Sequence, residues 1–157
     1  LKETKQFKDY MFRTERSKFL MEQGIPLNTD STLKGQTVFL AERCAELIQT
    51  DIITDRTVID VMAFTLNAKS IPYQDKEAFE EYAKEFIREY DYIFYISPYG
   101  IDIEDNGVRE TDEHYRDLID FTITTLIKRY GHKAGKIEKI SGSTEERIQQ
   151  ILNITGL

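Results

Sequence analysis

The sequence has only one cysteine, Cys44, and only two histidines, His114 and His132. A single cysteine excludes an internal disulfide and is typical of a reducing compartment. Two histidines are too few to build a zinc site together with Cys44. No apolar run approaches the roughly 18 residues of a membrane-spanning helix, and no signal peptide is visible. We therefore expect a soluble, cytoplasmic protein that does not insert into a membrane.

There is also no excess of positive charge: 28 acidic residues outnumber 21 basic ones, so the chain carries a net charge of −7 and has a pI near 5.0. This balance argues against a broad nucleic-acid surface, so an anionic substrate would need specific arginines. Two catalytic motifs are absent. There is no Gly-x-Ser-x-Gly elbow of a hydrolase, and there is no Gly-x-x-x-x-Gly-Lys-Ser/Thr loop to cradle phosphates.

What the sequence contains is an alternation of short strands and helices. Strands are predicted at residues 10–14, 52–54, 91–97 and 136–140, and amphipathic helices are predicted between and after them. The predicted N-caps of the helices lie among residues 28–32 and at Asp75, Asp112 and Ser143. Such alternation predicts an α/β fold with one parallel sheet covered by helices on both faces. The nearly continuous apolar run at 91–97 predicts a strand buried on both faces. In the helix at 32–49, Cys44 lies on the apolar stripe and is expected to have a buried packing role. Gln36, Arg43 and Glu46 lie off the stripe. Such residues are expected to be solvated, although Gln36, near the helix start, could face a cleft.

Charged clusters follow three of the predicted strands. They are Glu15 with Arg16 and Lys18, Asp55 with Arg56, and Asp105 to Arg109 with Arg116. Because the carboxyl ends of parallel strands share one edge of a sheet, we expect these clusters to converge. Converging acids and arginines suit phosphoryl transfer, which needs a metal, positive charge on the phosphoryl group and an orienting base. Taken alone, Asp55–Arg56 is equally well explained as a helix cap with a surface salt bridge.

At this point the residues resemble a known family, the P-loop nucleoside and nucleotide kinases. Residues 54–60, Thr-Asp-Arg-Thr-Val-Ile-Asp, resemble the family's Asp-Arg-Ser/Thr-x-x-Asp segment. The nearest branch is that of the nicotinamide riboside kinase-like, AAA-type ATP-binding proteins, which are often phage-encoded. Residues 14–20 and 90–96 resemble the second and fourth strands of that family. Residues 105–112 resemble its arginine-bearing lid, and residues 140–147 resemble its last strand and the turn near the adenine.

The resemblance implies an ATP- and Mg²⁺-dependent kinase, built as a three-layer P-loop domain over residues 1–157 with a mobile lid at about 100–116. Its acceptor would be a nucleoside, a nucleotide or a nicotinamide riboside-like molecule. Asp55 would contact the Mg²⁺ shell, Arg56 would bind phosphates, and Glu15 would orient or deprotonate the acceptor. The implied catalytic residues are Glu15, Asp55, Arg56 and Arg109. The implied substrate-binding residues are Arg16, Lys18, Gln36, Asp60 and Arg116, and Ser141 and Gly142 would bind ATP.

The missing phosphate loop is the main departure from the family. Since the segment beginning at Leu1 resembles the end of the family's first helix, the resemblance implies that the first strand and the P-loop precede it. Two other interpretations stay open. One is an ATPase or nucleotide-binding regulator without a small-molecule acceptor, and the other is a binding module that has lost ATP binding. The apolar helix faces are also compatible with a homodimer.

Overall fold

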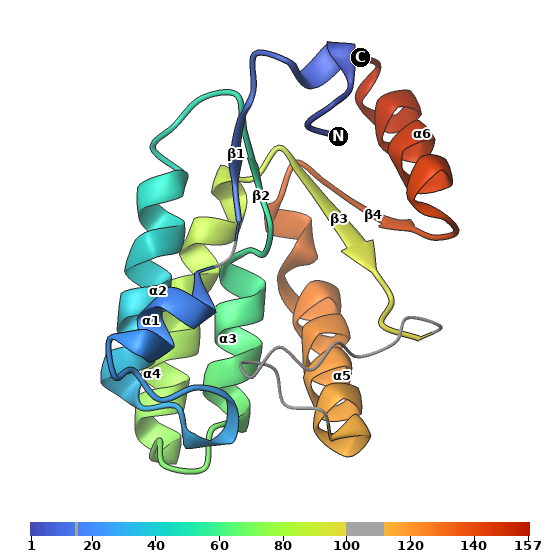
Figure 1. Ribbon diagram of the computed structural model, residues 1–157. Helices are drawn as coiled ribbons and strands as arrows, with labels where there is room; N and C mark the ends of the chain where they lie inside the picture. The colour runs from blue at the N-terminus through green and yellow to red at the C-terminus, as the bar shows by residue number, and fades with distance from the viewer. Residues whose placement is uncertain (15, 100–111) are drawn as a thin grey trace.

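The computed structural model describes residues 1–14, 16–99 and 112–157 and has a mixed α/β fold (Figure 1). The strands are β1 (Met11–Arg13), β2 (Ile52–Thr54), β3 (Tyr92–Ile96) and β4 (Lys136–Ile140). The α-helices are α1 (Ser17–Glu22), α2 (Leu33–Glu46), α3 (Val58–Asn67), α4 (Tyr73–Ala83), α5 (Glu113–Tyr130) and α6 (Thr144–Thr155). Short 3₁₀ turns are η1 (Lys5–Phe7), η2 (Asn28–Asp30), η3 (Lys84–Glu89) and η4 (Gly131–Lys133). The predicted alternation of strands and helices is confirmed.

Most helices begin where their capping residues predict. The Thr32 hydroxyl accepts a hydrogen bond from the Gly35 amide at the start of α2, and Asp112 caps α5 in the same way. Ser143 opens α6 in a capping box. The prediction that Asp75 caps α4 is wrong, because this helix begins earlier, directly after Pro72. The fixed φ of proline suits the start of a helix.

The strands form two small parallel sheets rather than the single sheet expected from the sequence. β1 pairs with β2, and β3 pairs with β4, each in parallel register. Among the described residues, no strand pairing joins the two sheets. β2 and β3 lie on the facing sides of the two pairs, and both strands start at the same end of the molecule (Figure 1). Each sheet therefore turns an unpaired strand edge toward the other.

A large cavity of about 1680 Å³ lies between the two sheets. All three residues of β2 and all five residues of β3 line it. Apolar side chains of α5, namely Ile119, Ile123 and Ile127, form part of the cavity wall. Phe7 of η1 and Ile151 of α6 also line it. The prediction that β3 is buried on both faces is wrong, since only Ile93 in this strand is buried. The apolar residues of β3 face a space that the described chain leaves open.

The main core is built around α3, which is buried on nearly every side. Val58, Met62 and Ala63 have no exposed surface, and α3 packs against α2, α4 and α5. Cys44 is half-buried against this core, and burial raises the pKa of its thiol, which fits the expected packing role. The rigid position of α3 fixes the turn that joins it to β2, where the candidate site lies.

Candidate functional site

The turn between β2 and α3 is held by hydrogen bonds to its backbone from several other elements. The Asp55 amide donates to the Arg13 carbonyl of β1 over 2.9 Å, and the Asp55 carbonyl accepts from Arg43 Nη1 of α2 over 3.2 Å. The Thr54 hydroxyl donates to the Arg56 carbonyl over 2.9 Å. On the helix side, the Tyr90 hydroxyl accepts from the Val58 amide over 3.2 Å. The turn is thus fixed mainly through its main chain.

Arg56 adopts a left-handed backbone conformation, with φ of 89°. Side-chain-bearing residues rarely adopt such a conformation, which costs on the order of 1–3 kcal/mol and persists only where the surroundings enforce it. The bonds at Asp55 and Thr54 supply that enforcement. Strain of this kind concentrates at functional sites.

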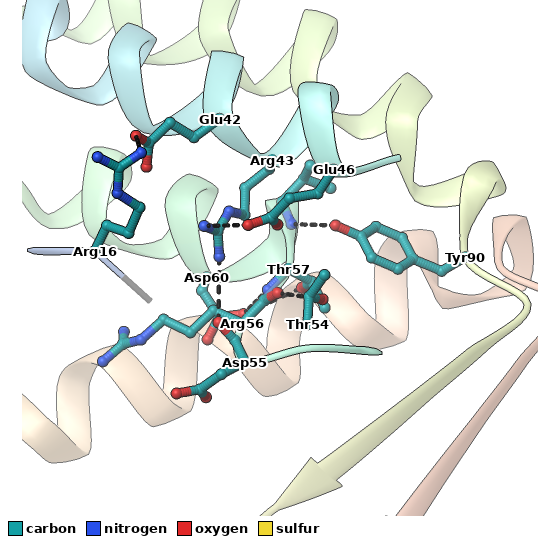
Figure 2. A network of polar contacts seen from close by, with 11 residues as sticks. Arg16, Glu42, Arg43, Glu46, Thr54, Asp55, Arg56, Thr57, Asp60 and Tyr90 are labelled. Carbon is teal, nitrogen blue, oxygen red and sulfur yellow. Dashed lines mark hydrogen bonds and ion pairs between the residues drawn. The ribbon is translucent and has the colours of Figure 1, made fainter. Parts of the chain in front are cut away.

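The side chains of Asp55 and Arg56 are left available by this arrangement. The Asp55 carboxylate is exposed, and it forms no hydrogen bond or ion pair with any described residue. The Arg56 guanidinium lies over the Phe64 ring, 5.2 Å from its centroid, and has no carboxylate partner among the described residues. Both side chains line the cavity, and Figure 2 shows both pointing away from the Arg43–Glu46 pair. The surface salt bridge of the simpler interpretation is therefore not formed.

The cap of α3, which the simpler interpretation assigned to Asp55 and Arg56, is formed by other residues. Thr57 and Asp60 form a capping box at the start of α3. Asp60 Oδ2 accepts from the Thr57 amide over 2.7 Å and from its hydroxyl over 3.1 Å. Asp60 also lines the cavity, but its hydrogen bonds are those of a helix cap. Since Thr57 and Asp60 cap the helix, Asp55 and Arg56 are not needed for that role.

Arg43 is buried and the Glu46 side chain is largely covered, so the expectation that they are solvated is wrong. The Arg43 side chain is 2% exposed and that of Glu46 is 11% exposed, with Arg43 Nη2 lying 2.9 Å from Glu46 Oε1. Burial raises the pKa of Glu46, and the Arg43 charge acts in the opposite direction. Gln36 is buried on the same side of α2 and lines the cavity, as the cleft prediction required.

The structure brings some of the other predicted site residues to the cavity and not others. Lys18 and Arg116 line it, together with Asp55, Arg56, Asp60 and Gln36. Arg16 does not line the cavity, because it pairs with Glu42 over 3.1 Å and lies over the Phe19 ring. Glu15, Arg109 and residues 100–111 of the predicted lid lie outside the described residues, and the rest of the lid is the capped start of α5.

Ser141 and Gly142 line a separate, small pocket of about 370 Å³. The backbone of Ser141 is already paired with the side chain of Gln150. The Ser141 amide donates to Gln150 Oε1 over 3.3 Å, and Gln150 Nε2 donates to the Ser141 carbonyl over 2.7 Å. Gly142 has φ of 93°, and a side chain there would collide with Glu146. The proposed adenine contacts thus lie outside the large cavity.

The Asp55 carboxylate alone would supply only part of the coordination shell of a Mg²⁺ ion. The described part of the chain contains no group of three or more His, Cys, Asp or Glu side chains that could hold a metal ion. Mg²⁺ in phosphoryl-transfer sites keeps several waters and is held by one or two carboxylates together with substrate phosphates. An exposed carboxylate without a protein partner suits that role. A bound nucleotide would have to supply further ligands.

Across the cavity from this turn, Tyr95 of β3 donates to Asp120 Oδ1 of α5 over 2.5 Å. Burial, and then this hydrogen bond, raise the pKa of Tyr95 to about 12. A tyrosine in an unfolded chain has a pKa of about 10, so Tyr95 stabilises the fold fully below about pH 10. This contribution is lost as the pH rises toward 12. The bond ties β3 to α5 at the cavity wall.

A Tyr95→Phe variant should therefore lose less stability than the wild type between about pH 9 and 12. The measurement is the midpoint of urea unfolding across this pH range. Tyr92→Phe is the matched control, because it removes an exposed hydroxyl from the same strand. Parallel pH curves for Tyr95→Phe and the wild type would contradict the assignment.

Within residues 1–14, 16–99 and 112–157, no helix has both the length and the apolar character that crossing a bilayer requires. Compared with family models, with curated proteins and with solved structures, the chain matches none of them.

Proposed function

We propose that this chain provides the acceptor side of an ATP-dependent kinase for a nucleoside, a nucleotide or a nicotinamide riboside-like molecule. The observation that carries the proposal is the Asp55–Arg56 turn. Its backbone is fixed by neighbouring elements, while its two charged side chains stay available at the wall of one large cavity. Fixed backbone with unpaired charges is how a protein prepares groups for a ligand.

The cavity lining is less acidic than the chain as a whole, which makes it compatible with an anionic ligand. Basic and acidic side chains line it in equal number, although the whole chain has a net charge of −7. The planar guanidinium of Arg56 suits two-point binding of a phosphate, and Arg116 and Lys18 add positive charge on the same cavity. When bound, Mg²⁺ would neutralise phosphate charge, and Asp55 would hold its water shell.

The two small sheets, β1–β2 and β3–β4, support a more specific proposal for the fold of the complete domain. We infer that one further parallel strand fills the part of the cavity that lies between β2 and β3 and completes a three-layer, P-loop-like sheet, while the end of the cavity beside Asp55 and Arg56 stays open to the ligand. Unpaired backbone groups along the two inner edges would find partners in such a strand. A phosphate-binding loop that followed it would begin at the carboxyl ends of β2 and β3, beside Asp55 and Arg56. This arrangement would place the nucleotide phosphates next to the acceptor-side residues.

The product of the complete gene should transfer phosphate from ATP, with Mg²⁺, to a member of a panel of nucleosides, nucleotides and nicotinamide riboside. Formation of ADP and of the phosphorylated acceptor is followed by mass spectrometry. Asp55→Asn should lower the rate, whereas Asp9→Asn, which changes an exposed aspartate away from the cavity, should not.

Three outcomes separate the alternatives. Transfer to an acceptor supports the kinase. Acceptor-independent ATP hydrolysis that is unaffected by Asp55→Asn favours the ATPase or regulatory interpretation. A folded protein that neither hydrolyses ATP nor modifies any acceptor contradicts both enzyme proposals and favours a binding module.

A further inference from the structure

Arg43 is a charged residue in a place where charge is costly. It lies near the end of α2 with its side chain 2% exposed, and its Nε atom is buried without a hydrogen-bond partner among the described residues. Burying a guanidinium is unfavourable unless its charge and its donors are satisfied. Glu46 satisfies the charge, through Nη2. Glu46 itself keeps Oε2 buried and without a described partner, so the pair is not an optimised ion pair.

The second contact of Arg43 explains its position better. Nη1 donates to the Asp55 carbonyl over 3.2 Å, twelve residues further along the chain. That carbonyl belongs to the peptide that precedes the left-handed residue Arg56. The peptide on the other side of Asp55 is fixed by the bond from its amide to Arg13. Figure 2 shows the Arg43 bond reaching the backbone of the turn from which the Asp55 and Arg56 side chains extend.

We propose that Arg43 is a positioning residue: its bond to the Asp55 carbonyl holds the turn in the left-handed conformation that directs the Arg56 guanidinium into the cavity. This inference rests on the proposed kinase function for its consequence in catalysis. Arg43 also lines the cavity, but its Nη1 and Nη2 atoms bond to the Asp55 carbonyl and to Glu46, and the role that we assign to it is exerted through the turn. Glu46 compensates the Arg43 charge and has no further part in the site.

Two variants separate positioning from simple ion pairing. Glu46→Gln removes the negative charge but leaves an acceptor for Nη2 and leaves the bond to the Asp55 carbonyl. Arg43→Met combined with Glu46→Gln removes that bond without leaving either charge buried and unpaired, so the double variant should fold. Urea unfolding of both variants confirms folding before any activity is compared.

For the double variant we expect kcat to fall about 100-fold, since small displacements of a catalytic group have effects of that size. The KM for ATP should stay within about threefold, because an interaction made mainly in the transition state affects kcat rather than KM. Glu46→Gln should keep kcat within about threefold of the wild type. Equal losses of kcat in Glu46→Gln and in the double variant would overturn the inference, as would an unchanged kcat in the double variant.

A second readout does not depend on activity. The Arg56 amide-to-Hα coupling constant and its Cα and Cβ chemical shifts report its backbone conformation by NMR. They should move away from left-handed values in the double variant and stay in place in Glu46→Gln. Left-handed values retained in the double variant would overturn the inference. A wild-type protein that transfers no phosphate overturns the proposed function instead, and the NMR comparison then decides separately whether Arg43 holds the turn.

Discussion

Arg56→Ala should lower the rate of phosphoryl transfer by about 100- to 1000-fold, with the fold intact. Removing one preorganised group that stabilises transition-state charge typically has an effect of this size. The guanidinium has no carboxylate partner among the described residues, so its removal leaves no buried charge behind. Steady-state kinetics with ATP and the identified acceptor, together with an unfolding curve, measure both parts of the expectation.

The choice of alanine at this position matters. Glycine would relieve the left-handed strain at φ of 89° and change stability as well as chemistry, whereas alanine keeps the strain. Arg56→Lys should fall between the wild type and Arg56→Ala, because lysine keeps the charge but loses two-point binding. Arg88→Ala is the matched control, since Arg88 is exposed and lies away from the cavity. An Arg56→Ala protein with wild-type transfer would remove Arg56 from the site.

The second large expected effect is a gain in thermal stability when the cavity between the two small sheets is filled. If the complete gene product supplies the inferred strand, its Tm should exceed that of the 157-residue chain by roughly 10 °C or more, because several kcal/mol of added burial and pairing shift a domain of this size by that amount. Amide exchange in β2 and β3 should slow at the same time. Calorimetry and hydrogen exchange on the two proteins measure these changes.

A substitution in β2 tests whether the expected gain in Tm comes from filling the cavity. Ile53 lines the cavity, so Ile53→Ala should cost more stability in the longer protein than in the 157-residue chain. Ile48→Ala is the control, because Ile48 is 80% exposed and should cost little in either protein. Equal costs of Ile53→Ala in both proteins, or a complete gene product with no added protection in β2 and β3, would contradict the inferred strand.

The sequence predicted the helices and strands well because their signals are local. A capping residue such as Thr32 or Ser143 lies directly before the helix that it starts. The β-branched residues that indicate a short strand lie within that strand. The expectation of a parallel sheet is met only in part: both strand pairings are parallel, but none joins β2 to β3, because which strands become neighbours depends on contacts that no local pattern reveals. The exposure of β3 has the same cause.

The burial of Arg43 was missed because the apolar stripe of α2 suggested a different face. The buried face runs through Gln36, Leu40 and Arg43, at spacings of four and three residues, and two of these three side chains are polar. The signal available in the sequence was that Gln36 and Arg43 share one helix face with Leu40. Their partners, Thr65 for Gln36 and the Asp55 carbonyl for Arg43, are distant in the chain, so only the fold identifies them.

The Gln150 side chain already satisfies the hydrogen-bonding groups of the Ser141 backbone in the small pocket. Its carboxamide presents one acceptor and one donor to the Ser141 backbone, which is the pattern that the edge of a purine would also present. A base that paired there would have to displace Gln150, so hydrogen bonds would be exchanged rather than gained. Discrimination between bases at this position would then arise from shape and stacking. Gln150 would act as an internal competitor of such a base.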